Sequence, residues 1–445
     1  MKRSYWIITL LILALATIGL TGCSQPASTT PEAEQPAAEG GITLTLEDFK
    51  ATLDAGDALI VDARQSDIFN GWTLEGDAFP GHVKGAISFD ADWIDTNSER
   101  LPSVLESKGM VPEAPIVLYD TNGEDAAKLS AWLTSQGFSN IKTFDLNASA
   151  GDTSLTFEAF ENYAYVAPAQ AVKALIESDP SVLVFEASWG EVSESYSKGH
   201  LPRAVHINTD EVEEGPIWNR LSDDRLIEFA KNNGITKDST VVLYGDDSMA
   251  AYRIAVILKY MGVEKLHVLN GGTPAWTKAG YALETTANAK APVTDFGAAA
   301  PLNPGYIVDL EEAKALLADT AGSVLVDNRS WAEHIGETSG YSYIEGKGRP
   351  AGAVFGYAGT DNSNLDDFRN VDLTMRDPNE IEAMWADAGI TRDKNLSFFC
   401  GTGWRAAEIL MYADVLDFNK ISLYDGGWNE WQSLPELPIE TGEPK

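Results

Sequence analysis

The sequence predicts an α/β protein made of three tandem units, each with a parallel sheet flanked by helices. Two observations lead to this class. Short apolar runs typical of buried strands alternate with helical patterns, and the same order of runs occurs three times along the chain. The length agrees, because 445 residues, 44% of them hydrophobic, are too many for one core and suggest about three domains.

Each unit opens with a helical stretch and a short apolar strand run that ends near an acidic residue. These openings occupy residues 45–64, 167–188 and 308–329. A turn containing glycine follows in each unit, with the sequences GHVKGA, GHLPRA and GRPAGA starting at residues 81, 199 and 348. This shared opening is the first half of an internal repeat.

Each unit continues with a second buried-strand run and an amphipathic helix. The strand runs lie at residues 114–120, 239–245 and 396–400. Two units then close on a Gly-Gly turn with tryptophan behind it, at Gly271-Gly272 and Gly426-Gly427. Strands and helices in this order predict parallel βαβ connections. We place the first, second and third units at residues 42–150, 163–286 and 304–445.

Charge and cysteine content exclude several classes of function. The chain has 32 Lys and Arg against 67 Asp and Glu, a net charge of −35. This argues against a nucleic-acid partner, since binding phosphates needs a cationic surface. Two cysteines exclude a disulfide framework or a cysteine-rich metal site, and the five histidines show no metal-ligand spacing. We expect neither a metal nor an organic cofactor.

Residues 1–22 are predicted to be a signal peptide rather than part of the fold. Two basic residues precede an apolar run that is too short for a membrane-spanning helix. The run ends in LTGC at 20–23, which resembles the bacterial lipobox, where the cysteine is acylated. Residues 23–41, rich in Pro, Ala, Ser and Glu, are typical of a disordered tether. We expect an extracytoplasmic protein anchored to a bacterial membrane through lipid on Cys23; an ordinary secretory signal is the alternative.

The loop between the second strand and its helix distinguishes the third unit from the other two. In the third unit it reads CGTGWR, from Cys400 to Arg405. The matching loops at residues 120–125 and 245–250 read DTNGED and GDDSMA, and contain neither cysteine nor arginine. Only the third unit offers a nucleophile and a cation at this place, so we expect the first two units to be catalytically inactive.

The third loop suits a reactive thiolate. A cysteine at the carboxyl end of a strand that enters a helix faces the free N–H groups and the positive dipole end of that helix. This placement favours the reactive thiolate form. Gly401 and Gly403 let the backbone bend so that several N–H groups point at one sulfur or anion. Arg405 adds a positive charge with two-pronged geometry for an oxyanion. The alternative is a buried cysteine without chemistry.

At these residues the units resemble rhodanese domains. The matching motifs are the Cys400–Arg405 loop, VDNR with Asp327 and Arg329, the GRPAGA turn, and DGGW at 425–428. The resemblance covers nearly everything after residue 42 and is weakest in the first unit. It implies the rhodanese fold and thiosulfate sulfurtransferase activity, with a small anionic sulfur donor and either cyanide or a thiol as acceptor.

The resemblance also implies a double displacement. The Cys400 thiolate attacks the outer sulfur of thiosulfate, sulfite leaves, and an acceptor takes the sulfur from the resulting persulfide. The residues implied to bind the substrate are Gly401, Thr402, Gly403, Trp404 and Arg405. Among them, Arg405 and the loop N–H groups would hold the oxyanion end and stabilise charge on the leaving sulfite. The first two units would serve packing, substrate access or a protein partner.

Further residues are candidates for the surroundings of the site. Asp327 and Arg329 are expected to tie a strand end to neighbouring backbone, and touching the site is the alternative. Arg349 takes the place of the histidine that the other two units keep in the same turn. It either helps to attract an anionic donor or forms a surface charge pair. The acidic run at 210–214 is interpreted as a solvated face, with a calcium site as the alternative.

Other functions remain open on this sequence. Phosphatases of related architecture use a loop one residue longer, C-x5-R, whereas the spacing here is C-x4-R. Mercaptopyruvate is an alternative donor, although Arg405 favours an inorganic oxyanion over a keto acid. A binding or scaffold role would not require a complete CGTGWR loop, and a thiol redox sensor would lack a resolving cysteine.

Overall fold

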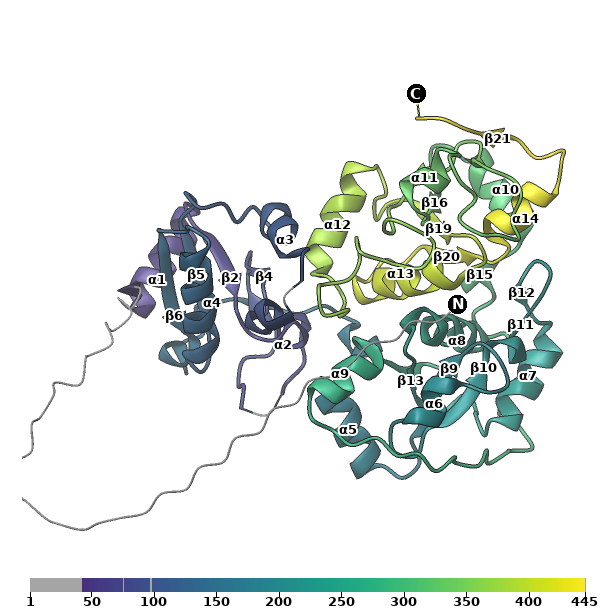
Figure 1. Ribbon diagram of the computed structural model, residues 1–445, viewed down its shortest axis with the longest axis horizontal. Helices are drawn as coiled ribbons and strands as arrows, with labels where there is room; N and C mark the ends of the chain where they lie inside the picture. Colours follow the sequence, from purple (N-terminus) through teal and green to yellow (C-terminus); the bar gives the residue numbers. More distant parts are fainter. Residues whose placement is uncertain (1–41, 75, 97, 445) are drawn as a thin grey trace, which may run out of the picture. The chain divides into compact units, whose positions relative to one another are not determined.

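The computed structural model describes residues 42–74, 76–96 and 98–444. In this part of the chain there are three five-stranded sheets, ordered β1-β6-β5-β2-β4, β8-β14-β13-β9-β10 and β15-β20-β19-β16-β18. All strand pairs within these sheets are parallel, and helices pack around each sheet (Figure 1). The predicted fold class of three parallel α/β units is therefore confirmed, and the strand order is the same in each.

The first unit follows this order closely. Its sheet contains β1 (Ile42–Thr43), β2 (Leu59–Asp62), β4 (Ile87–Ser88), β5 (Ile116–Asp120) and β6 (Ile141–Asp145). Its helices are α1 (Leu46–Ala55), α2 (Ser66–Asn70), α3 (Leu101–Ser107) and α4 (Glu124–Ser135). A small antiparallel pair, β3 (His82–Val83) with β7 (Phe157–Glu158), lies outside the sheet. The Thr45 side chain begins α1 by accepting the Asp48 N–H at 3.1 Å.

The second unit adds a hairpin to the same plan. Its sheet contains β8 (Val166–Ala167), β9 (Leu183–Ser188), β10 (Val205–Asn208), β13 (Thr240–Tyr244) and β14 (Lys265–Leu269). Its helices are α5 (Ala169–Ser178), α6 (Glu194–Lys198), α7 (Asp223–Asn232), α8 (Ser248–Met261) and α9 (Gly272–Lys278). The hairpin is formed by β11 (Glu213–Glu214) and β12 (Asn219–Arg220), which pair antiparallel.

The third unit contains the CGTGWR loop. Its sheet contains β15 (Ile307–Val308), β16 (Ser323–Asp327), β18 (Val354–Phe355), β19 (Asn395–Phe399) and β20 (Ile421–Tyr424). Its helices are α10 (Leu310–Ala318), α11 (Trp331–His334), α12 (Pro378–Asp387), α13 (Trp404–Val415) and α14 (Gly427–Ser433). β17 (Arg349–Pro350) pairs antiparallel with β21 (Ile439–Glu440). The loop joins β19, the middle strand of the sheet, to α13.

Helices α8 and α13 share one hydrophobic core between the second and third units. Every residue of α8 is buried, and in α13 only Trp404 and Asp414 are not. A helix that is buried all round lies between two packed layers, here its own sheet and the helix of the other unit. The Tyr252 and Tyr412 rings meet edge to face with centroids 5.5 Å apart.

A buried ion pair lies beside this helix contact. Glu408 of α13 is fully buried and accepts from Arg369 Nε at 2.7 Å and from Arg369 Nη2 at 2.5 Å. The Tyr412 hydroxyl donates to the same carboxylate at 2.8 Å. Because both charges are removed from water, each needs the other to offset its desolvation.

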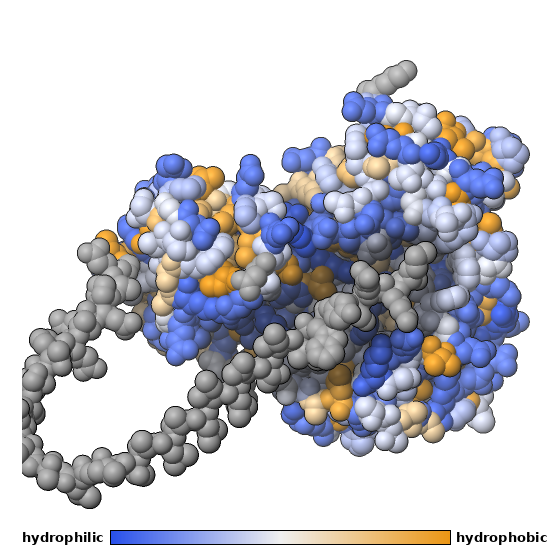
Figure 2. Space-filling model, viewed as in Figure 1, coloured by the Kyte–Doolittle hydropathy of each residue, from blue (hydrophilic) through white to orange (hydrophobic). Residues whose placement is uncertain are grey.

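Outside the core, hydrophilic residues cover most of the face shown in Figure 2, in keeping with the acidic composition. Among the described residues no helix is long and apolar enough to cross a membrane. The predicted signal peptide, the tether and Cys23 lie outside the described residues, so the lipid anchor stays a prediction.

Removing the buried charge of Glu408 is expected to destabilise the protein strongly. Glu408→Gln removes the carboxylate that is hydrogen-bonded to the buried Arg369 guanidinium, which should lower the free energy of unfolding by about 3 kcal/mol. Glu382→Gln is the matched control, because Glu382 pairs with Arg392 at the surface, where a pair contributes about 0.5 kcal/mol. Denaturant unfolding followed by circular dichroism measures both, and equal losses would contradict the assignment.

Candidate active site

Cys400 lies directly between the middle strand of the third sheet and the helix that follows it. Its side chain is buried, and its Sγ accepts the Gly403 N–H at 3.2 Å. Gly403 has φ +97°, a left-handed conformation that favours glycine, and it precedes the first residue of α13. The loop therefore turns the sulfur toward the amino-terminal end of the helix, where N–H groups and the helix dipole stabilise negative charge.

The Gly426-Gly427 turn forms the wall behind the cysteine. The Trp428 N–H donates to the Cys400 carbonyl at 2.8 Å, and the Asn429 N–H donates to the Gly401 carbonyl at 3.0 Å. Gly427 has φ +53°, and a Cβ there would lie only 2.6 Å from the Cys400 carbonyl oxygen. A side chain at this position would push the loop away, which explains the glycine directly before the tryptophan.

Arg405 is buried and paired with an acid. Its Nη1 and Nη2 donate to the two carboxylate oxygens of Glu333 at 2.9 and 2.8 Å. It also donates to the Asp361 carbonyl at 3.1 Å and to the Tyr341 hydroxyl at 3.3 Å. Burial alone would raise the pKa of Glu333, but the charge of Arg405 outweighs it and lowers that pKa. The two Nη groups of Arg405, which the sequence predicts to hold an oxyanion, thus bind Glu333. Of the guanidinium nitrogens of Arg405, only Nε lacks a partner among the described residues.

Asp327 and Arg329 tie the end of β16 to the GRPAGA turn, as the sequence predicts. Arg329 donates to both Asp327 oxygens at 2.8 and 2.7 Å and to the Gly348 carbonyl at 2.8 Å. Burial opposes ionisation of Asp327, but Arg329 and His334 prevail and lower its pKa to about 2. The Arg329 guanidinium also lies 4.9 Å from the centre of the Trp428 ring, so this pair braces the wall behind Cys400.

Arg349 hydrogen-bonds a backbone carbonyl as a histidine does at the same place in each of the other two units. It is buried, and its Nη1 donates to the His334 carbonyl at 3.1 Å and to the Gly442 carbonyl at 2.8 Å. In the first and second units, histidine Nδ1 atoms donate to the equivalent carbonyls at 2.8 Å, in the pairs His82–Phe69 and His200–Tyr196. Arg349 also forms an ion pair, in which its Nη2 lies 3.3 Å from Glu440 Oε2. Arg349 is therefore held within the fold. The predicted surface charge pair is wrong, because Arg349 is buried and only Glu440 is exposed.

Two tyrosines form an aromatic rim at the loop. The Tyr341 ring lies so close to Gly401 that a Cβ there would be 2.3 Å from it. Tyr343 is half exposed, and Thr402 lies close enough to its phenol to oppose the rise in its pKa. Burial raises the pKa of both phenols, and the charge of Cys400 raises each further. Sequence reasoning missed both residues, because the GYSY segment at 340–343 matches no motif and lies far from the loop in the chain.

The acidic run at 210–214 is a solvated face only in part. Asp210 and Glu214 are exposed, as the sequence suggests, but only 2% of Glu213 is exposed. Its carboxylate accepts from Trp404 Nε1 at 2.7 Å and from Arg253 Nε at 2.9 Å. Arg253 Nη1 also donates to Asp425 at 2.7 Å. The hairpin of the second unit thus reaches the loop of the third, and the physical reason is that a buried cation on α8 draws two carboxylates inside.

Comparison with known proteins agrees with this geometry. The rhodanese-like domain family matches residues 45–146, 168–279 and 309–434. The chain belongs to the rhodanese-like family. It is 38% identical to the thiosulfate sulfurtransferase YnjE of Escherichia coli over 417 residues, covering 92% of this chain and 93% of the relative. The resemblance found in the sequence is confirmed, and the rhodanese-like chain groups with sulfurtransferase enzymes.

Three further matches are named for, or were solved with, other small molecules. The 3-mercaptopyruvate sulfurtransferase of Escherichia coli is 27% identical, over 59% of this chain and 93% of its own. The anaerobic ergothioneine biosynthesis enzyme of Chlorobium limicola, solved with trimethyl histidine, has a TM-score of 0.86 at 36% identity, covering 91% of this chain and 100% of that one. A persulfide form of EanB with ergothioneine matches with a TM-score of 0.85 at 36% identity.

The equivalent loops of the other two rhodanese-like units hold no thiol. In the first, Asp120 stands where Cys400 does, and its carboxylate accepts the Gly123 and Ala126 N–H groups at 2.9 Å each. In the second, Gly245 takes this place, and a Cβ on it would lie 2.6 Å from the Ala187 carbonyl oxygen. The N–H groups of the first loop thus point at a carboxylate, in the place where those of the third loop face sulfur.

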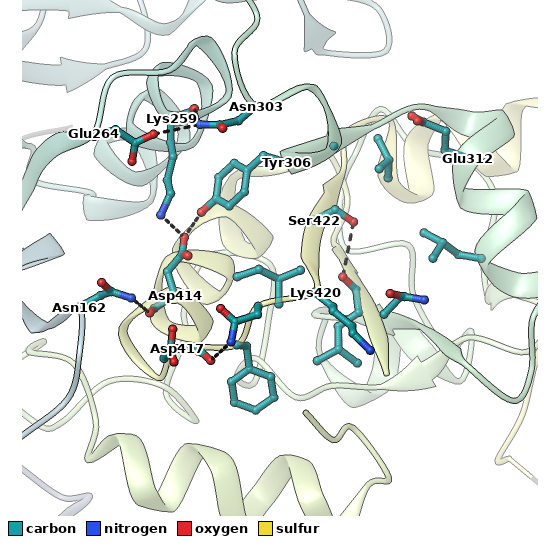
Figure 3. A pocket seen from close by; sticks show the side chains of 18 residues that line it. Asn162, Lys259, Glu264, Asn303, Tyr306, Glu312, Asp414, Asp417, Lys420 and Ser422 are labelled. Carbon is teal, nitrogen blue, oxygen red and sulfur yellow. Dashed lines mark hydrogen bonds and ion pairs between the residues drawn. The ribbon is translucent and has the colours of Figure 1, made fainter. Parts of the chain in front are cut away.

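A cavity of about 720 Å³ lies at the opposite end of the third sheet from Cys400. Asn395, the first residue of β19, lines it, whereas Cys400 follows the last. Figure 3 shows Lys259 of α8 and Tyr306 converging on Asp414 of α13, and Lys259 Nζ lies 2.9 Å from the carboxylate. This cluster joins the second and third units away from the sulfur. In the described part of the chain no group of His, Cys, Asp and Glu side chains is arranged to hold a metal ion.

A side chain at position 427 is expected to disable the site. Gly427→Ala pushes against the Cys400 and Gly401 carbonyls and should lower the sulfurtransferase rate about 100-fold, because small displacements of reacting groups have large effects. Gly389→Ala is the matched control: Gly389 also has positive φ, +75°, but has open space around its Cβ position. Both variants lose some stability to backbone strain, so a rate for Gly427→Ala equal to that of the control would contradict the role of this turn.

Proposed function

We propose that this chain transfers the sulfane sulfur of thiosulfate, through a persulfide on Cys400, to cyanide or a thiol acceptor. The observation that carries the proposal is the Gly403 N–H, which donates to the Cys400 sulfur at 3.2 Å at the start of α13. A sulfur held at a helix amino terminus is favoured as thiolate, and the thiolate is the nucleophile. The similarity to YnjE supports thiosulfate as donor.

The chemistry is a double displacement. The Cys400 thiolate attacks the outer sulfur of thiosulfate, a new S–S bond forms, and the old S–S bond breaks with its electron pair leaving on sulfite. The acceptor then attacks the outer sulfur of the persulfide, and the thiolate returns as leaving group. The loop N–H groups stabilise the negative charge that resides on sulfur in both steps.

Arg405 supports this chemistry by holding the loop and the rim. Its two Nη atoms are committed to Glu333, which offsets its charge inside the protein. Its contact with Tyr341 connects the rim to the first turn of α13. Binding of the anionic part of the donor is therefore assigned mainly to the backbone N–H groups of residues 401–405, as the carboxylate of Asp120 illustrates in the first unit.

A second candidate function is transfer of the persulfide sulfur to an imidazole such as trimethyl histidine. The observation that favours it is the aromatic rim of Tyr341 and Tyr343, beside a cation that Glu333 already offsets. Aromatic faces attract quaternary ammonium groups. The similarity to the trimethyl histidine complex supports this acceptor. Mercaptopyruvate remains the alternative donor, supported by the relative named for it.

Thiosulfate treatment is expected to add one sulfur atom to the parent protein and none to Cys400→Ser. Since serine offers no thiolate, the variant cannot form a persulfide. Intact mass spectrometry after removal of excess thiosulfate measures the adduct, and subsequent cyanide should restore the original mass with release of thiocyanate. An equal adduct or equal thiocyanate formation in both proteins would overturn the proposal.

The persulfide form of the protein distinguishes between the possible acceptors. Once loaded, the protein is divided between cyanide, a small thiol and trimethyl histidine, and loss of the adduct is followed over time. Fast unloading by cyanide or the thiol supports the first function, and unloading by trimethyl histidine with formation of its thiol product supports the second. Tyr343→Ala should slow only the trimethyl histidine reaction, because it removes an aromatic face without touching the sulfur.

We also propose that the protein is held at a bacterial membrane by lipid on Cys23, facing away from the cytoplasm. The LTGC sequence at 20–23 supports this, and two or more acyl chains give stable anchoring. Cys23→Ser expressed in a bacterial host should move the protein from the membrane fraction to the soluble fraction while its sulfurtransferase rate is unchanged. Membrane attachment that persists in Cys23→Ser would contradict the anchor.

A further inference from the structure

The hairpin of the second unit places Glu213 against the first turn of α13. Glu213 is buried, and its Oε1 accepts from Trp404 Nε1 at 2.7 Å. Trp404 directly follows Gly403, whose N–H donates to the Cys400 sulfur. A hydrogen bond to a carboxylate is stronger than one between neutral groups. This contact therefore fixes the residue adjacent to the N–H group that faces the sulfur.

Arg253 of α8 contacts the other side of the same loop. Its Nε donates to Glu213 Oε2 at 2.9 Å, and its Nη1 donates to Asp425 Oδ1 at 2.7 Å. Asp425 precedes the Gly-Gly turn that forms the wall behind Cys400. A Cβ on Gly403 would lie 2.9 Å from Arg253 Nη1, so the guanidinium lies directly against the loop backbone.

These contacts form a closed ring around the Cys400 loop. It runs from Trp404 through Glu213 and Arg253 to Asp425, and returns through the turn to the Cys400 carbonyl. We propose that Glu213 and Arg253 are positioning residues for the Cys400 loop, so that the second unit, which has no nucleophile, completes the active site of the third. The assignment rests on the proposed role of Cys400 as nucleophile.

Burial makes Glu213 sensitive to pH, and the unbalanced charges of the ring add to this effect. One guanidinium, Arg253, faces two carboxylates, Glu213 and Asp425. Burial raises the pKa of Glu213 to about 7 and the charge of Asp425 contributes, although Arg253 and the Trp404 N–H oppose the rise. A further titratable group near Glu213 is Tyr343, whose pKa is raised by burial and, further, by this carboxylate.

Alkylation of Cys400 by iodoacetamide tests the ring without any sulfur donor. In the full chain, Glu213→Ala and Trp404→Phe should each slow alkylation about tenfold, because each removes the same contact beside the Gly403 N–H. The double variant should be no slower than either single variant. Glu214→Gln is the matched control, since this neighbouring carboxylate is exposed and pairs with Arg225, and it should keep the rate of the parent.

Multiplicative losses in the double variant, about 100-fold in total, would overturn the proposal, as would unchanged rates in both single variants. If Glu213→Ala does not fold, as judged by circular dichroism, Trp404→Phe and Glu213→Gln still decide it. In turnover with thiosulfate and cyanide the same variants should lower kcat while KM stays within about twofold. If the parent is alkylated normally but does not turn over thiosulfate, the result contradicts the proposed donor and not the proposed role of the ring.

The pH dependence provides a readout that loss of stability would not produce. Below its pKa, Glu213 is protonated and resembles glutamine, so the parent and Glu213→Gln should alkylate at similar rates near about pH 6. Above it, the ionised carboxylate holds Arg253 and Trp404, so the ratio of parent to variant should rise to several-fold near about pH 8. Taking the ratio cancels titration of the thiol itself. A ratio of one at both pH values would overturn the assignment.

Discussion

The packing of α8 against α13 is the interaction on which the site depends. Because α13 is buried almost all round, between its own sheet and a helix of the second unit, it has little freedom to shift or tilt. Its amino terminus is where the Cys400 sulfur accepts the Gly403 N–H. The same helix contact brings Arg253 and Glu213 to the loop. The sulfur is positioned by a junction between two units rather than by one unit alone.

Negative charge at the Cys400 sulfur is stabilised mainly by the backbone. The cation of the loop, Arg405, is paired with Glu333, and the neighbouring Arg329 and Arg253 are paired with Asp327 and with Glu213 and Asp425. In a chain of net charge −35, the groups left to stabilise an anion at the sulfur are therefore peptide N–H groups and a helix dipole. Peptide groups do not titrate, so this part of the site works over a wide pH range, and pH sensitivity is left to side chains around it.

The repeated strand and helix pattern was sufficient to predict the fold class, the three units and the place of Cys400 between a strand and a helix. The Asp327–Arg329 tie was also predictable, because the pair recurs as Asp62 and Arg64 in the first unit. Glu333 and Glu213 were not, since they meet Arg405 and Trp404 across 72 and 191 residues of chain. Glu213 also sits in an acidic run that looks like surface, and burial by a distant arginine leaves no local signal.

The backbone of the second unit leaves no room for a cysteine at the place equivalent to Cys400. A Cβ on Gly245 would lie 2.6 Å from the Ala187 carbonyl oxygen. Introducing cysteine there by a single mutation would collide with backbone, and several concerted changes would be needed to open the space. A chain built in this way has no short mutational route to two equal enzymes, and its second unit is left to adapt to its neighbour.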